Sequence, residues 1–102
     1  TTMGLSWSKD WDPSRCSNDY EVAIRTSKLL EHLLVTEFGA IGGGLSEKVR
    51  SARGVPEPLE RRIRYLARQR NALVHDLNID ALPDRKGFIK CYTEAKAELE
   101  RL

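Results

Sequence analysis

Apolar positions recur along most of the chain at intervals of three and four residues, the spacing that places side chains on one face of an α-helix. Three long stretches have this pattern, at residues 19–38, 57–76 and 84–102, and a short one covers residues 46–53. No stretch alternates apolar and polar positions as a half-buried strand does. The pattern predicts an all-α fold, a small bundle of three long helices and one short helix.

Residues that favour helix ends flank these stretches. Ser17 or Asn18 can cap the first helix, and Gly39 can end it because glycine enters the left-handed conformation without steric cost. Ser46 is expected to cap the short helix, with Gly54 beyond its end. The third helix follows the sequence VPEP, since proline is tolerated in a first helical turn.

The third helix has two contrasting faces. At about 100° per residue, its apolar stripe is formed by Leu59, Ile63, Leu66, Leu73 and Leu77. Arg70 falls inside this stripe, about 40° from Leu66 on an ideal helix. The opposite face carries His75, with Asn71, Arg64 and Arg68 close to it in angle. An arginine on an apolar stripe is costly unless it is paired or lies at an interface, so the pattern favours a homodimer.

Charge is distributed unevenly along the chain. The formal net charge is +2, yet residues 45–75 contain eight basic and three acidic residues, so the remainder is net negative. A local basic concentration suits an anionic partner, and it makes RNA-binding candidates of Arg61, Arg64 and Arg68. A solvated helix face is the simpler alternative.

Length and composition limit the class of protein. With 102 residues, 40% of them hydrophobic, the chain suits one domain, expected at residues 18–102. Residues 1–17 are expected to be an N-terminal extension, either a tag remnant or a segment of a larger parent protein. Cys16 and Cys91 lack metal-ligand spacing, which indicates free thiols in a reducing, cytoplasmic compartment. No apolar run reaches the roughly 18 residues of a membrane span. No metal, cofactor or membrane association is predicted.

The segment GAIGGGLSEK is rich in glycine but does not have the G-x-x-x-x-G-K-[ST] pattern of a P-loop, because Leu45 and Ser46 follow Gly44. It leads into a predicted helix N-terminus, a place where a phosphate could bind. A flexible connection between two helices is the simpler interpretation.

The segment RNALVHD contains Arg70, Asn71 and His75, and it resembles the R-x4–6-H signature of HEPN domains, which are small α-helical bundles. Four residues separate Arg70 from His75, and a polar residue, Asn71, follows the arginine as it commonly does in that family. Arg68 also has a matching spacing, with six intervening residues. The layout of a long first helix, a short basic connector and the motif helix is similar too. The resemblance covers roughly residues 19–102.

The resemblance implies a metal-independent endoribonuclease that is active as a homodimer, with two motif helices meeting across a composite cleft. In this role His75 accepts the proton of the ribose 2′-OH, Arg70 stabilises charge on the phosphoryl oxygens, and Asn71 orients either group. Arg70 and His75 lie about 140° apart on an ideal helix, so they converge only through a bend or across two protomers. Arg68 and His75 share a face, which leaves the identity of the catalytic arginine open.

Two other interpretations remain, so enzymatic activity is itself an open question. Many HEPN-like domains are non-catalytic modules for dimerisation or for docking a protein partner, and the N-terminal extension favours that role. The second is a generic helical bundle with a coincidental motif. In it His75 is a surface histidine and Arg70 pairs with a carboxylate such as that of Glu31. The surroundings of His75 should discriminate, because an open basic groove favours the nuclease and an apolar groove favours partner docking.

Overall fold

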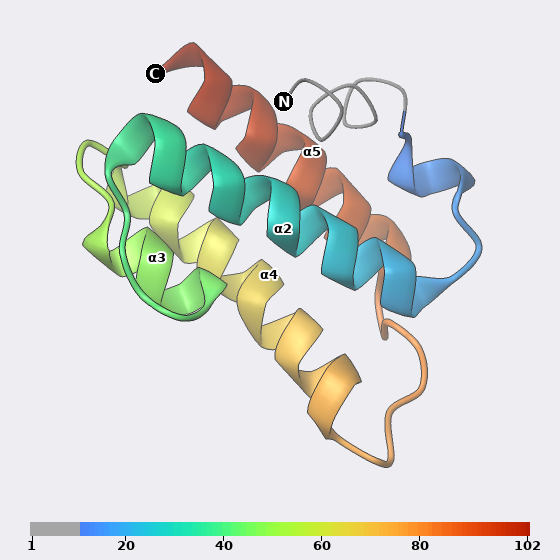
Figure 1. Cartoon of the computed structure of the whole chain (residues 1–102). Coiled ribbons are helices and arrows are strands. Elements are labelled where there is room, and N and C mark those ends of the chain that lie inside the picture. The colour runs from blue at the N-terminus through green and yellow to red at the C-terminus, as the bar shows by residue number, and fades with distance from the viewer. Residues whose placement is uncertain (1–10) are drawn as a thin grey trace.

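The computed structural model describes residues 11–102, and every regular element in that range is helical (Figure 1). One short 3₁₀ helix precedes four α-helices, in the order η1 (Pro13–Arg15), α2 (Asp19–Phe38), α3 (Leu45–Ser51), α4 (Glu57–His75) and α5 (Arg85–Arg101). The prediction of an all-α bundle with three long helices and one short one is therefore confirmed for this range. None of these helices is long and apolar enough to cross a membrane.

The ends of α2 and α5 are set by local hydrogen bonds. The Asn18 side chain accepts from the backbone N–H of Glu21 at 3.0 Å, which identifies Asn18 rather than Ser17 as the N-cap. Gly39 ends α2 with a φ of 64°, as predicted for a left-handed C-cap. At the start of α5, the Asp84 carboxylate accepts from the N–H of Gly87 at 3.0 Å.

The short helix differs from its predicted bounds at both ends. Its N-cap is Gly44, so the prediction of Ser46 as the cap is wrong, and Ser46 lies within the first turn. The reason is Glu47, because its carboxylate already accepts from the backbone N–H groups of Gly43 and Gly44. The helix stops at Ser51 because the N–H of Arg53 donates to α2, at the carbonyl of Phe38.

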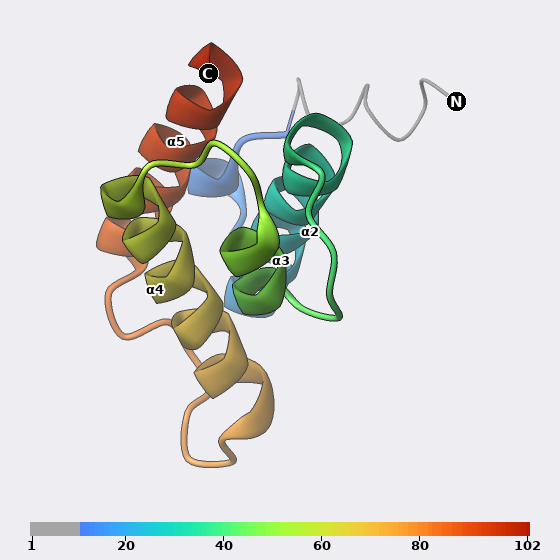
Figure 2. The same cartoon turned by 90° about the vertical axis from the view of Figure 1, so that its left-hand side faces the viewer.

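Helix α4 is the central element of the bundle. It runs antiparallel to α2 and α5, and it packs against α2, α3 and α5 (Figures 1 and 2). The largest fully buried apolar side chains come from all four α-helices: Val22, Leu30, Leu34, Val49, Leu59, Ile63, Leu66, Leu73 and Phe88. Burial of such a side chain stabilises the fold by about 1.5–3 kcal/mol. The core therefore fixes the orientation of α4, and with it the positions of the motif residues.

The predicted apolar stripe of α4 is correct within the helix and wrong at its C-terminal end. Leu59, Ile63, Leu66 and Leu73 are all buried, as the helical spacing predicted. Leu77 is fully exposed, because α4 ends at His75 and the helical angle has no meaning beyond that point. Leu102, which follows the last residue of α5, is exposed as well.

The segment before α2 is attached to the bundle through Arg85. The guanidinium of Arg85 forms an ion pair with Asp19 and donates to the carbonyl oxygens of Pro13 and Cys16. Residues 11–16, part of the expected extension, are thus tied to the first turn of α5. Residues 1–10, which also belong to that extension, lie outside the described range.

Candidate functional site

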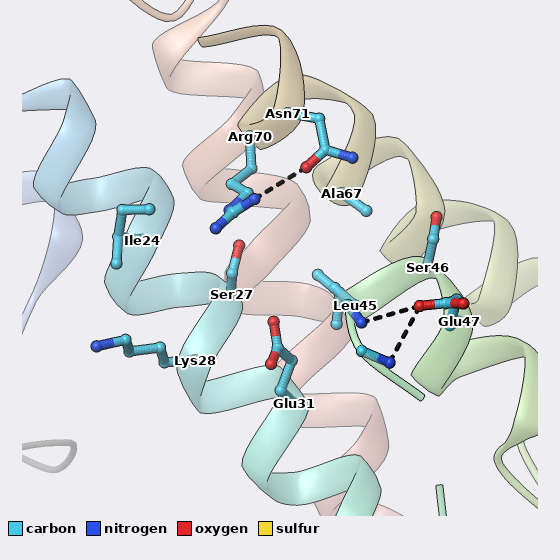
Figure 3. Close-up of a pocket in the computed structure, with 12 residues that line it drawn as sticks. Ile24, Ser27, Lys28, Glu31, Leu45, Ser46, Glu47, Ala67, Arg70 and Asn71 are labelled. Carbon is cyan, nitrogen blue, oxygen red and sulfur yellow. Dashed lines mark hydrogen bonds between the residues drawn. The ribbon is translucent and has the colours of Figure 1, made fainter. Parts of the chain in front are cut away.

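The structure places Arg70 and Asn71 at a cavity of about 330 Å³ between α2, α3 and α4 (Figure 3). Ala67 lies beside them on α4, and the opposite wall comes from α2 and the glycine-rich loop. The full set of lining residues is Ile24, Ser27, Lys28, Glu31, Gly43, Gly44, Leu45, Ser46, Glu47, Ala67, Arg70 and Asn71. Two of the three predicted catalytic residues therefore face one concave surface.

Arg70 is half-buried, in agreement with its position near the apolar stripe of α4. Its Nη1 donates to Oδ1 of Asn71 at 3.0 Å, whereas its buried Nε has no hydrogen-bond partner among the described residues. The ion pair with Glu31, given above as an example for the generic-bundle interpretation, is not formed, because Glu31 pairs with Lys48 at 3.4 Å. Within residues 11–102, then, the guanidinium has no carboxylate to neutralise it.

Ser27 on α2 is the site residue that the sequence reasoning missed. Its side chain is 3% exposed, its hydroxyl has no partner within the described part of the chain, and in Figure 3 it points toward the guanidinium of Arg70. Its neighbour Thr26 is equally buried, but its hydroxyl donates to the carbonyl of Val22 at 2.8 Å. The signal was available: Ser27 occupies a core position in helical register with Ala23, Leu30 and Leu34.

The acidic residues around the cavity are occupied by other contacts. Glu31 is held by Lys48, whose Nζ also donates to the carbonyl of Gly42 at 2.9 Å. The carboxylate of Glu47 points toward the backbone amides of the glycine-rich loop, on the side of the cavity away from Arg70 (Figure 3). Lys28, at the mouth, is exposed and has no ion pair among the residues described. The end of the cavity at Arg70 is therefore positive in character.

His75 lies elsewhere, at the last position of α4. It is exposed and does not line the cavity that contains Arg70 and Asn71. In both views the C-terminal end of α4 and the loop after it extend beyond the rest of the bundle (Figures 1 and 2). Next to His75 are two exposed apolar side chains, Val74 at 39% and Leu77 at 101% relative exposure. A single chain thus does not bring the three predicted catalytic residues together.

The predicted RNA-binding arginines are on the surface but are unequally available. Arg61 pairs with Glu57 at 3.4 Å, and Arg64 pairs with Glu60 at 3.6 Å, each one turn away along α4. Surface ion pairs between residues one helical turn apart contribute only about 0.3–0.5 kcal/mol, so an RNA phosphate can displace them. Arg68 is exposed, and no ion pair holds it within the described range.

Two further observations bear on the nature of the site. Within residues 11–102, no group of three or more His, Cys, Asp or Glu side chains is arranged to hold a metal ion. No family model, no curated protein and no solved structure matches the chain, so its site is interpreted from its own geometry.

Proposed function

We propose that this chain is a HEPN-like domain that forms a homodimer and cleaves RNA without a metal ion, through attack of a ribose 2′-OH on the adjacent phosphate. The observation that carries the proposal is the state of Arg70. Its guanidinium faces a cavity, its Nε is buried without a partner, and no carboxylate of the described chain pairs with it. This arrangement is expected of a guanidinium that binds an anionic oxygen of a ligand.

The energetics of Arg70 support a phosphate as its partner. A half-buried charge loses hydration, and without a counter-charge that loss destabilises the fold. A phosphoryl oxygen restores the balance, because guanidinium–phosphate hydrogen bonds are short, charge-assisted and often bidentate. The bond from Nη1 to Asn71 fixes one edge of the guanidinium, which orients the remaining donors. Arg70 is therefore suited to stabilising the charge that develops on a phosphorane.

The position of His75 explains why the proposal includes a second copy. Along an ideal helix, Arg70 and His75 are about 7.5 Å apart in rise and about 140° apart in angle. In a two-fold dimer, His75 of the partner subunit can approach the Arg70 cavity of the first. The exposed Val74 and Leu77 lie at the end of α4 that such a partner would cover.

In the proposed reaction, neutral His75 removes the proton from the 2′-OH, and the resulting oxygen nucleophile attacks the neighbouring phosphorus. Arg70 stabilises the pentavalent phosphorane. The bond from phosphorus to the 5′-oxygen of the next nucleotide then breaks and that oxygen takes up a proton from water, while the protonated His75 returns its proton to solvent. The products are a 2′,3′-cyclic phosphate and a 5′-hydroxyl. Arg68, which shares a helix face with His75, is the alternative stabilising group within the same chain.

A non-catalytic interaction module is the second candidate function. It is favoured by the same exposed apolar pair, since Val74 and Leu77 could dock a different protein instead of a second copy. In that case the positive cavity and His75 belong to unrelated surfaces.

The deciding experiment is cleavage of labelled RNA by the purified protein in the presence of a chelator. Removal of a general base typically lowers the rate by about 10²–10⁴-fold, so His75→Ala should lose activity to that extent. His32→Ala is the matched control, because His32 is the other histidine of the chain and is also exposed, on α2. If the wild-type dimer cuts no RNA, or if His75→Ala cuts as well as His32→Ala, catalysis is rejected and the interaction module takes its place.

A further inference from the structure

The cavity between α2, α3 and α4 holds a hydrogen-bonding group, the hydroxyl of Ser27, that the proposed RNA cleavage does not use. In the described part of the chain, two buried side-chain polar atoms lack a partner, and both line this cavity. One is Nε of Arg70 on α4, and the other is the hydroxyl of Ser27 on α2, which points toward the guanidinium of Arg70 (Figure 3). Most buried polar groups are hydrogen-bonded, so two unmatched groups at one cavity indicate a ligand.

We infer that this cavity binds a phosphate monoester, with the phosphate between Arg70 and Ser27 and with Lys28 at the mouth. The inference goes beyond RNA cleavage, because it requires neither His75 nor a second copy of the chain. Arg70 is common to both roles, so a bound monoester would exclude an RNA phosphate from that guanidinium.

Charge favours a phosphate monoester over a simple carboxylate. Glu31 is neutralised by Lys48, and Glu47 is directed to the glycine amides, so neither compensates Arg70. Arg70 and Lys28 remain as two cations without an ion pair among the described residues. Lys28 points away from Arg70 in Figure 3, but its exposed, flexible side chain can turn toward a ligand. A phosphate monoester carries about −1.5 to −2 at pH 7, which matches two cations, whereas a carboxylate matches one.

The dimensions of the cavity call for an organic group attached to the phosphate. Its volume of about 330 Å³ lies at the lower end of the range for small-molecule sites, roughly 300–1,000 Å³. Ile24, Leu45 and Ala67 add apolar wall, against which a ring could pack. Two sources share this chemistry, a free nucleoside monophosphate and the phosphorylated 5′ end of an RNA strand.

Calorimetric titration of the purified full chain tests the inference, with AMP and a 5′-phosphorylated short RNA as ligands and the same RNA without its phosphate as a control. Arg70→Gln should weaken binding by about tenfold or more, since charge-assisted hydrogen bonds are lost. Ser27→Ala should weaken it several-fold and is not expected to disturb folding, because it removes a hydroxyl that has no partner. Lys90→Gln, on the exposed side of α5, should have no effect.

The outcomes separate this site from RNA cleavage. Binding of AMP that persists in His75→Ala supports the inference even if no RNA is cut. Binding of the phosphorylated RNA alone supports it with a strand end as the ligand. The inference is overturned if neither ligand binds at millimolar concentration, or if binding is unchanged in both Arg70→Gln and Ser27→Ala. Equal affinity for acetate would overturn the assignment to phosphate.

Discussion

Arg70 and His75, five positions apart on α4, have opposite surroundings. Arg70 is half-buried in a cavity whose walls come from three helices of the same chain (Figure 3). His75 is exposed at the end of the helix, where α4 extends beyond the bundle beside the apolar side chains of Val74 and Leu77 (Figure 1). Helices of the same chain therefore surround Arg70, whereas His75 faces solvent. A reaction that uses both residues needs a second surface.

After the loss expected for His75→Ala, the next largest effect comes from removing the enclosed arginine. Arg70→Ala should lower RNA cleavage by about 10²–10³-fold, the usual loss when a preorganised donor to a developing oxyanion is removed. Arg68→Ala should lower cleavage only a few-fold and should reduce the salt slope of RNA binding by about one, because an exposed arginine contributes one phosphate contact. Cleavage rates and salt titrations of the two variants give the comparison. If Arg68→Ala is the more damaging change, the same-face arginine is the catalytic one.

A smaller effect is expected at the open end of α4. Val74→Asp should weaken the proposed dimer by roughly tenfold or more, because it places a carboxylate on a surface that the partner covers. Val35 on α2 is 44% exposed, close to the 39% of Val74, so Val35→Asp is the matched control and should leave the dimer intact. Light scattering over a dilution series measures both. If both changes weaken the dimer equally, the dimer interface lies elsewhere. If the wild-type protein is a monomer, there is no such interface.

Much of the fold was predictable because its determinants are local. Helical spacing and the caps at Asn18 and Gly39 depend on residues within a few positions of each other. The place of Arg70 beside the apolar stripe also follows from angle alone. The cavity could not be predicted from the sequence, because it depends on how α2 packs on α4 and on the ion pair that Lys48 forms with Glu31. The fate of Leu77 depended on one boundary, the end of α4, and that is the least predictable property of a helix.

The smallest expected effect concerns stability within the cavity wall. Ser27→Ala should leave the free energy of unfolding unchanged or raise it by up to about 1 kcal/mol, because the buried hydroxyl has no partner to lose. Thr26→Val should lower it by about 0.5–1.5 kcal/mol, since the hydroxyl of Thr26 donates to the carbonyl of Val22. Urea denaturation without ligand compares them. A clear loss of stability in Ser27→Ala would mean that the hydroxyl has a structural partner and is not reserved for a ligand.

The central claim, that Arg70 of one protomer and His75 of its partner form one site, is tested most directly by mixing two inactive variants. In a heterodimer of Arg70→Ala and His75→Ala, one of the two composite sites receives both native side chains and the other receives neither. Random exchange of subunits makes about half of the dimers mixed, so the account predicts recovery of about a quarter of the wild-type cleavage rate. If the mixture is no more active than either variant alone, although exchange is demonstrated by mass, the two residues do not act across a dimer and the composite site is contradicted.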